Sequence, residues 1–392
     1  MNERKTTLSI FNIEFESDFI EFYDFLYSTI KERDGLFGIM KVILSNFLIE
    51  PLIPVDLKNE FLFFKSIKGK DYDKLFFEIS SQCQYDKHVI DLNSRKSILG
   101  FWGTLKVLRK VKLRSLQKNN FSYRVFVFSY LLFITKVLAK AKSWRCDFYV
   151  SFADMQPIEN VLTQFFKKQG VFTSTMQHGL YVDYSASPNI NVVNYKNVVA
   201  DNFLAWGEET KQLIELYKPG TNVHVLGKTN LNLKPSGEDS GYFTLIFDQV
   251  LFKDFNKKLL AIGYELANLT GYQMNIRIHP RDNINNYDIE QNSSIFIDED
   301  ISGSIFILGH TTSLIYELLS QGFKVFKLRS DVPANKGIEV LEFDDSGELL
   351  NLVKLQPTIN PEYYIKYVGK EAKIKYREFF SKIHENNSAH IY

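Results

Sequence analysis

Cysteine is scarce in this chain, because Cys83 and Cys146 are the only two among 392 residues. Two thiols cannot form a disulfide framework or, by themselves, a structural zinc site, so metal or redox chemistry through sulfur is disfavoured. Long apolar runs are missing as well. The strongest apolar window, 125–135, is shorter than the roughly 20 residues that a membrane-spanning helix requires, and it predicts a buried helix instead. The N-terminus has no signal-peptide core, so we expect a cytoplasmic protein.

Two phosphate-binding fingerprints are absent from the sequence. Neither GxGxxG nor GxxxxGKS/T occurs, which disfavours a Rossmann dehydrogenase and a P-loop ATPase. Two Asp-x-Asp matches do occur, one at Asp71 and Asp73 and one at Asp298 and Asp300. We interpret both as solvated turns and expect no metal site.

Acidic residues are absent between Asp91 and Asp147, whereas 95–145 contains thirteen Lys and Arg residues. Within this basic helical segment, 102–118 places Leu105, Leu108 and Leu116 among the basic residues, which fits a basic amphipathic helix on an anionic bilayer. A solvated helix face is the alternative interpretation. We expect no nucleic-acid partner, because the sequence pI is near 7.7 and no nucleic-acid-binding module is present.

Strands and helices alternate from about residue 147 onward. The pattern predicts strands at 148–152, 171–176, 197–206 and 223–226, then a polar, turn-rich linker at 228–241, and then a second series of strands and helices. Such alternation indicates parallel sheets with crossover helices. We therefore expect an α/β protein with two doubly wound domains, 1–230 and 241–360. A final segment, 361–392, would form a helix that packs back on the first domain.

The end of the strand at 171–176 is a candidate catalytic position. Gln177, His178, Gly179 and Tyr181 follow this strand, at the edge of a parallel sheet where ligands bind. An imidazole that titrates near neutral pH suits a general base. A structural histidine is the alternative interpretation of His178.

In the second domain, candidate ligand-binding residues follow several predicted strands. Hydroxyls at the start of a helix can bind an anion, and a carboxylate one turn further on can accept hydrogen bonds from ribose or sugar hydroxyls. A simple helix cap is the alternative for these hydroxyls. The residues are Gln249, Arg277, His279, His310, Thr311, Thr312, Ser313 and Glu317.

Taken together, these motifs resemble a known group of enzymes. The motifs are Gln177-His178-Gly179, Trp206-Gly207, Gln249, His279-Pro280, and Thr311-Thr312-Ser313 followed by Glu317 and Gly322. The combination resembles bacterial GT-B transferases that build surface polysaccharides, and it is similar to capsule and lipooligosaccharide sialyltransferases and to teichoic-acid glycerophosphotransferases. The sialyltransferases carry an acidic motif where this chain has Gln177-His178-Gly179. The glycerophosphotransferases carry an aromatic residue where it has Gln177.

The resemblance implies a GT-B fold, with two Rossmann-like domains facing across a cleft. It implies a metal-independent glycosyltransferase without a cofactor, which moves a sugar from a nucleotide-sugar donor to a lipid-linked or polysaccharide acceptor in capsule biosynthesis. His178 would deprotonate the acceptor hydroxyl, His279 would contact the donor nucleotide, and the Thr311–Ser313 hydroxyls its phosphate. Segment 95–145 would contact the inner face of the plasma membrane. Three other functions stay open: a CDP-glycerol-type polyol-phosphate transferase, a non-hydrolysing sugar-nucleotide epimerase, and a catalytically silent binding partner.

Overall fold

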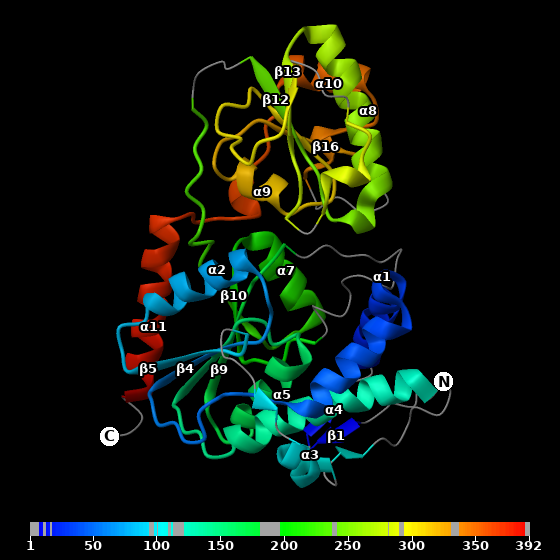
Figure 1. The fold of residues 1–392 in the computed structure, drawn as a ribbon. Helices are drawn as coiled ribbons and strands as arrows, with labels where there is room; N and C mark the ends of the chain where they lie inside the picture. The colour runs from blue at the N-terminus through cyan, green and yellow to red at the C-terminus, as the bar shows by residue number, and fades with distance from the viewer. Residues whose placement is uncertain are drawn as a thin grey trace, which may run out of the picture. The chain divides into compact units, whose positions relative to one another are not determined.

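The chain forms two compact units, each built around its own parallel sheet (Figure 1). The first unit combines Met1–Ala205, Thr210–Val225 and Lys373–Tyr392, and the second combines Trp206–Glu209 and Leu226–Ala372. The computed structural model describes residues 8–10, 13–15, 18–93, 98–99, 101–108, 111–112, 121–180, 197–236, 241–280, 282–289, 294–330 and 337–388.

The sheet of the first unit has six parallel strands in the order β11-β10-β9-β8-β4-β5. The strands are β4 (Phe61–Lys65), β5 (Lys87–Asp91), β8 (Phe148–Ser151), β9 (Phe172–Met176), β10 (Asn202–Ala205) and β11 (Asn222–Val225). All residues of β4, β8 and β10 are buried. This burial explains their short, continuous apolar runs, because a parallel strand is covered on both faces.

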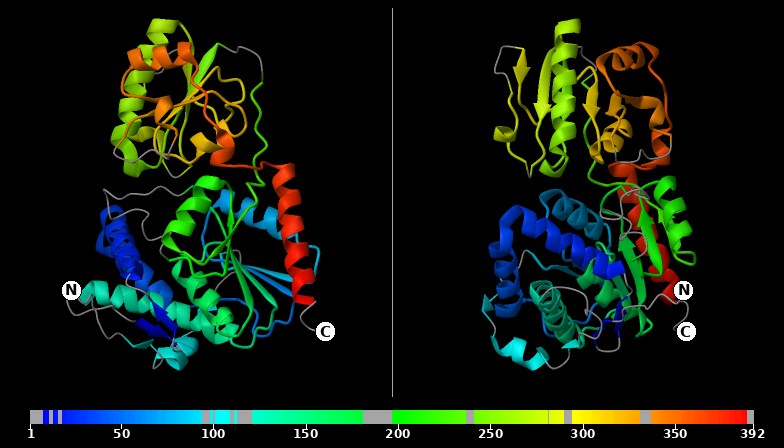
Figure 2. Two further views of the ribbon diagram at one scale, coloured as in Figure 1. Left: turned by 180° about the vertical axis from the view of Figure 1, so that it is seen from behind. Right: turned by 90° about the vertical axis from the view of Figure 1, so that its right-hand side faces the viewer.

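Helices cover both faces of this sheet (Figure 2). Tyr149 of β8 stacks on Phe166 of α5 (Pro157–Lys167), in a core that also includes α1 (Asp18–Leu48) and α4 (Phe121–Ala141). On the other face, α11 (Lys370–Ser388) inserts Phe380 against Phe61 and Phe63 of β4. The remaining helices are α2 (Lys70–Ser81) and α7 (Glu208–Tyr217). The last helix of the chain therefore packs on the first sheet.

Helix α4 is the element whose composition most resembles a membrane span. It is long and apolar enough to cross a bilayer, but 61% of its most apolar window is buried inside the unit. Phe126, Val127, Leu131 and Leu132 are each at most 1% exposed. The prediction of a buried helix over 125–135 is confirmed.

Small elements of the first unit correct the prediction of one basic helix. A three-stranded antiparallel sheet has the order β2-β1-β7, and its strands are β1 (Leu8–Ile10), β2 (Ile13–Phe15) and β7 (Val111–Lys112). Strand β3 (Ile49–Glu50) pairs with β6 (Ile98–Leu99). Helix α3 covers only Phe101–Leu108. The helix expected over 102–118 is therefore wrong, because Val111 and Lys112 pair as a strand with Ile10 and Ser9. The described helices within the basic segment 95–145 are α3 and α4.

The second unit has six parallel strands in the order β14-β13-β12-β15-β16-β17. The strands are β12 (Tyr242–Ile246), β13 (Gln273–Arg277), β14 (Ile295–Phe296), β15 (Ile307–Gly309), β16 (Val325–Leu328) and β17 (Glu342–Phe343). The helices are η1 (Val250–Phe252), α8 (Lys253–Thr270), η2 (Ile284–Asn286), α9 (Leu314–Leu319), η3 (Glu339–Leu341), α10 (Ser346–Leu355) and η4 (Pro361–Tyr363). Phe243, Leu245 and Phe247 share a core with Leu259 and Leu266 of α8.

The strand order of each sheet reverses at one point. In the second unit, chain order runs outward from β12 in one direction to β14 and from β15 in the other to β17, as in doubly wound dinucleotide-binding folds. In the first unit, the reversal lies between β4 and β8. Both sheets are therefore doubly wound, as predicted. Ligands of such sheets bind beyond the carboxyl ends of the strands at this reversal.

Candidate functional site

The reversal point of the second unit carries a buried hydrogen-bond network. Asp248 follows β12 and is 6% exposed, and His310 and Thr311 follow β15. The Thr311 hydroxyl contacts both the Asp248 carboxylate and Nδ1 of His310, the latter at 2.9 Å. The second Asp248 oxygen accepts the backbone N–H of Gln249 at 2.6 Å. The two loops are thus joined at the position where a ligand of this sheet is expected.

Asn256 of α8 holds Asp248 and His310 of the same network in place. Its side-chain oxygen accepts the backbone N–H of Asp248 at 2.9 Å, and its amide nitrogen donates to the Asp248 carbonyl at 2.9 Å and to the Tyr287 hydroxyl at 2.6 Å. His310 Nε2 lies 2.6 Å from the same Asn256 oxygen. The backbone contacts fix which amide atom is oxygen, so His310 carries its proton on Nε2.

This network has one proton fewer than its contacts require. With the His310 proton on Nε2, Nδ1 is an acceptor, and it faces the Thr311 hydroxyl. That hydroxyl also faces the Asp248 carboxylate, yet it has a single proton to donate. Burial, and secondarily the charge of Lys327, lowers the pKa of His310 to about 3, which disfavours a second proton on the imidazole. All three groups are satisfied at once only when the network binds one further proton.

The other predicted residues of this unit lie around the network. The Gln249 side chain is exposed, and Arg277 is the last residue of β13. His279 is half-buried, and its carbonyl accepts the backbone N–H of Asp282 at 2.8 Å. Thr312 Oγ1 accepts the backbone N–H of Leu314 at 3.3 Å, so it acts as a local cap. Helix α9 has only six residues, so its dipole contributes little to the binding of an anion.

Glu317 is held by a lysine from the segment predicted as a linker. Lys228 Nζ lies 2.5 Å from Glu317 Oε1, and the two side chains are 8% and 14% exposed. The same ammonium lies 4.5 Å from the centre of the Trp206 ring. The Ser313 hydroxyl is 3.5 Å from Glu317 Oε1, so this oxygen is the more heavily engaged of the two.

Glycine at 227 allows the backbone contact that positions Lys228. Gly227 has a φ of 80°, and a Cβ there would lie 2.0 Å from the Tyr367 carbonyl oxygen. The backbone N–H of Lys228 donates to this carbonyl at 2.9 Å, and the Lys228 carbonyl accepts from Gly369 at 2.9 Å. Residues 228 and 368 pair as an isolated parallel bridge. The lysine is therefore built into the unit by backbone contacts on both sides.

In the first unit, His178 lies against aromatic rings beyond the end of β9. Its ring centre is 5.6 Å from that of Tyr72 in an edge-on arrangement, and 5.7 Å from that of Phe152. The side chain keeps part of its surface accessible. This desolvating environment lowers the pKa of His178 to about 4, so the imidazole is neutral and able to accept a proton at pH 7.

Gln177 fixes the loop that carries His178. Its amide nitrogen donates to the carbonyl of Gly179 at 2.8 Å and to the Thr210 hydroxyl at 3.0 Å, and the residue is fully buried. A side chain used in this way sets the loop conformation instead of reaching a ligand. Tyr181, which was predicted to lie at the same ligand-binding edge, lies outside the described residues.

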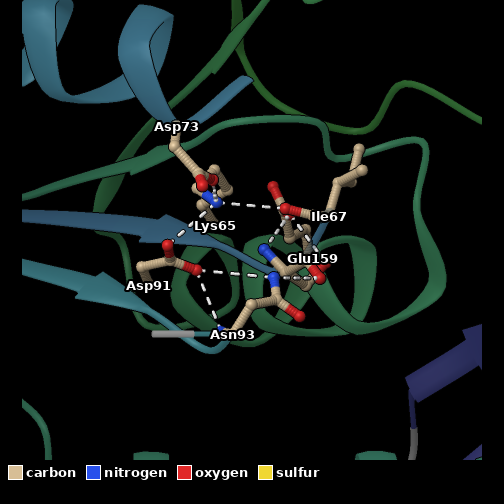
Figure 3. Close-up of polar contacts among 7 residues, drawn as sticks. Lys65, Ile67, Asp73, Asp91, Asn93 and Glu159 are labelled. Atoms are coloured by element: carbon tan, nitrogen blue, oxygen red, sulfur yellow. Dashed lines mark hydrogen bonds and ion pairs between the residues drawn. The ribbon is translucent and has the colours of Figure 1, made fainter. Parts of the chain in front are cut away.

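Lys65 forms an ionic hub at the end of β4 (Figure 3). This fully buried side chain pairs with Asp73 of α2 and with Asp91 of β5, the latter at 3.0 Å, and it donates to the carbonyl of Ile67 at 3.0 Å. An ammonium has three protons, so all of its donors are used within the protein. Lys65 therefore orders the loops at this edge and has no remaining donor for a phosphate.

Glu159 fills the reversal point of the first sheet. Its carboxylate accepts the backbone N–H and the hydroxyl of Ser66, both at 2.7 Å, and the backbone N–H of Ala153 at 2.5 Å. Ser66 follows β4 and Ala153 follows β8, so these are the donors that would otherwise face an anionic ligand. Burial raises the pKa of Glu159 to about 8 despite these hydrogen bonds. The chain's own carboxyl group thus occupies this position.

The first Asp-x-Asp match was interpreted wrongly as a solvated turn. Asp73 lies in the first turn of α2 and pairs with Lys65. Asp298 and Asp300 do form turns, because their carboxylates accept the backbone N–H groups of residues 300 and 302. Within the described ranges, no group of three His, Cys, Asp or Glu side chains could hold a metal ion.

Comparison with known proteins identifies the fold. No family model matches the sequence, and no curated protein matches it. Among solved structures, the chain is similar to UDP-GlcNAc 2-epimerase of Methanocaldococcus jannaschii, with 16% identity, 82% of this chain and 99% of that chain covered, and a TM-score of 0.51. It is similar to the same enzyme of Rickettsia bellii, with 14% identity, 84% and 97% covered, and a TM-score of 0.51.

A lipopolysaccharide outer core galactosyltransferase also matches, with 12% identity, 82% and 99% covered, and a TM-score of 0.45. At such identities, a similarity establishes the fold alone. Together with the two doubly wound sheets, the similarity to the two epimerase structures confirms the predicted GT-B fold. The resemblance to sialyltransferases and glycerophosphotransferases stays a prediction.

Proposed function

We infer that this protein is a glycosyltransferase that uses a nucleotide-sugar donor. The proposal depends on the side chains at the carboxyl edge of each sheet. The first unit has the neutral imidazole of His178 there. The second unit has the carboxylates of Asp248, which is hydrogen-bonded to the Thr311 hydroxyl, and Glu317, which pairs with Lys228. The fold adds support, since the solved epimerase of M. jannaschii with this fold is in complex with UDP-GlcNAc and UDP. The proposed acceptor is a lipid-linked or polysaccharide hydroxyl of a capsule pathway.

His178 is the proposed general base. The acceptor oxygen forms a bond to the anomeric carbon of the sugar, the bond from that carbon to the nucleotide phosphate breaks, and the acceptor proton passes to His178. The lowered pKa keeps the imidazole in its accepting form throughout the physiological pH range. We therefore expect the pH profile of kcat/KM to lack a His178 inflection near 6.5 and to fall only toward pH 4.

Donor recognition is proposed for the second unit. Asp248 and Glu317 carry carboxylates that suit ribose and sugar hydroxyls, because a carboxylate accepts hydrogen bonds from hydroxyls and repels phosphate. Arg277 and His279, which end and follow β13, suit the departing phosphate. No metal or other cofactor is included in the proposal. The enzyme would act in the cytoplasm at the inner face of the plasma membrane, with the basic segment 95–145 near the lipid headgroups.

A matched pair of histidine variants tests the proposal. We expect His178→Ala to abolish sugar transfer while a donor nucleotide still raises the melting temperature, because a ligand of the native state stabilises it. His384→Ala is the control. His384 lies in the same unit and stacks on Tyr85, with ring centres 3.8 Å apart. Its ring also lies near Phe148, the first residue of β8, and so at the opposite edge of the sheet. Transfer by His178→Ala at the wild-type rate would remove His178 from the role of base.

Sugar-nucleotide epimerisation is the second candidate, because the two epimerase structures described above share the fold of this chain. An epimerase converts its UDP-sugar without any acceptor, whereas a transferase releases the nucleotide only slowly in the absence of an acceptor. Incubation with UDP-, GDP-, CMP- and CDP-linked donors, with and without acceptor, separates the two. Glycerol phosphate transfer from CDP-glycerol in the same panel would identify a polyol-phosphate transferase, and failure of every nucleotide to bind would indicate a silent partner.

A further inference from the structure

The outer face of α1 is apolar although it is exposed. After the break in the helix at Gly35, four large side chains recur at intervals of three or four residues, which places them along one side of the helix. These are Phe37, Met40, Leu44 and Leu48, with exposed fractions of 81%, 52%, 51% and 38%. We call these four side chains the α1 face.

The opposite side of the same helix is also apolar. Ile39 and Ile43 are 1% and 6% exposed and belong to the core shared with α4. A helix that is apolar all round is normally buried on all sides. The side with Ile39 and Ile43 is covered by the unit itself, whereas the α1 face stays partly to largely exposed. Such an exposed apolar strip marks an interaction surface.

Helix α3 extends the apolar surface from the end of α1. The Thr104 hydroxyl of α3 donates to the carbonyl of Phe47, which joins the two helices. Thr104 is buried at this junction, whereas Trp102 and Leu105 are 75% and 43% exposed. Tryptophan is enriched at membrane interfaces, because one end of its ring is apolar and the other polar.

The charge around these helices favours an anionic partner. Residues 35–49 include one charged side chain, Lys41, which is exposed. The flanking residues Asp34 and Glu50 are acidic, and Glu50 pairs with Lys140 of α4. Residues 92–146, which include α3, contain basic residues and no acidic one. A second copy of the chain would bring like charges together, whereas anionic lipid headgroups are complementary to them.

We propose that the α1 face, together with Trp102 and Leu105, inserts into the interface of an anionic lipid bilayer. Exposed basic side chains such as Lys41 and Lys142 then interact with headgroups, while the apolar side chains reach the acyl boundary. The membrane contact then includes α1, which lies outside the basic segment 95–145. The inference rests on the membrane location in the proposed function but does not depend on the transfer chemistry.

Tryptophan fluorescence of the full chain gives a direct test. The chain has three tryptophans, and Trp144 and Trp206 are at most 1% exposed, so Trp102 dominates any change in surroundings. We expect vesicles of equal parts phosphatidylglycerol and phosphatidylcholine to shift the emission to shorter wavelength. Vesicles of phosphatidylcholine alone should do so much less, and added salt should weaken the response.

A double variant tests the α1 face. Phe37→Ser with Met40→Ser should reduce vesicle binding, measured by flotation, by roughly tenfold or more, because burial of one such side chain is worth that factor. Leu355→Ser is the matched control: Leu355 is 76% exposed but lies on α10 of the second unit, and its loss should leave binding unchanged. Circular dichroism checks that each variant is folded.

The outcomes separate this inference from the proposed function. Absence of wild-type binding to anionic vesicles overturns the inference, as does equal binding by the double variant. A wild-type dimer that the double variant abolishes would assign the α1 face to a second copy and would also overturn it. Sugar transfer to a soluble acceptor without vesicle binding leaves the function standing, and vesicle binding without any donor turnover leaves only the inference.

Discussion

The Lys228–Glu317 pair allows the structural and ligand-binding roles of the second unit to be measured separately. Glu317→Gln keeps the shape of the side chain but removes the charge that lies 2.5 Å from Lys228 Nζ. Loss of one partner from a buried pair costs about 3–5 kcal/mol, because the other charge stays buried without compensation. The Trp206 ring, 4.5 Å from Lys228 Nζ, still stabilises that charge by about 1–2 kcal/mol. We therefore expect a loss of about 1–4 kcal/mol in the free energy of unfolding.

The assay is urea unfolding of four proteins: wild type, Glu317→Gln, Lys228→Met and the double variant. The double variant should regain most of the stability, because the buried charge is gone, and the cycle then gives the coupling energy of the pair. Donor affinity is measured in parallel by thermal shift. Equal unfolding free energies for wild type and Glu317→Gln would refute the reasoning from burial. A loss of donor affinity in the double variant, whose stability is restored, would place Glu317 in contact with the donor.

Three further predictions concern the second unit, with Gly220 of the first unit as a comparison for one of them. Thr311→Val should lower the free energy of unfolding by about 1–3 kcal/mol, since the Asp248 carboxylate and His310 Nδ1 lose the one hydroxyl proton that they share, while Thr311→Ser should stay near wild type in the same urea titration. Gly227→Ala should be more destabilising than Gly220→Ala in thermal unfolding: both glycines have positive φ, but only at Gly227 would the Cβ meet backbone, whereas open space surrounds Gly220. His310 is neutral in the fold with a pKa of about 3, against about 6.5 unfolded, so its contribution is complete above pH 6.5 and is lost as pH falls toward 3. Urea unfolding at pH 7 and pH 5 should show a drop of about 2 kcal/mol from this group, which His310→Gln removes; an unchanged pH dependence in that variant would contradict the assignment.

The regular part of the fold could be predicted because its sequence periodicity is local. Strands β8 and β9 each lie within a residue of the strands predicted at 148–152 and 171–176. The first 145 residues were harder to interpret. Phe61–Lys65 is a central strand whose five residues are all buried, yet its short apolar run resembles the many aromatic clusters around it. Only pairing with β8, more than 80 residues later in the chain, distinguishes it.

The residues of the candidate sites likewise divide into those that local sequence predicted and those that it did not. Loops at strand ends were found because strand position alone places them, as for His178 and the Thr311 turn. Lys65, Asp91, Glu159 and Lys228 were missed, because their partners lie in other elements of the fold: Lys65 pairs with Asp91 of β5, Glu159 with Ser66 after β4, and Lys228 with Glu317 of α9. One local signal did exist. Lys65 and Asp91 each end an apolar strand, where a charged residue at a buried position calls for a partner.

The placement of Phe380 against β4 has a consequence for how the protein is made. The chain begins in the first unit, leaves it after Val225 to build the second, and returns only at Lys373 to supply α11. Until then, Phe61 and Phe63 on the aromatic face of β4 lack a cover that the finished molecule has. During synthesis the ribosome must therefore complete the second unit before the first can close. A stop codon shortly before α11 would release a chain whose second core is intact and whose first unit exposes an apolar surface that favours aggregation.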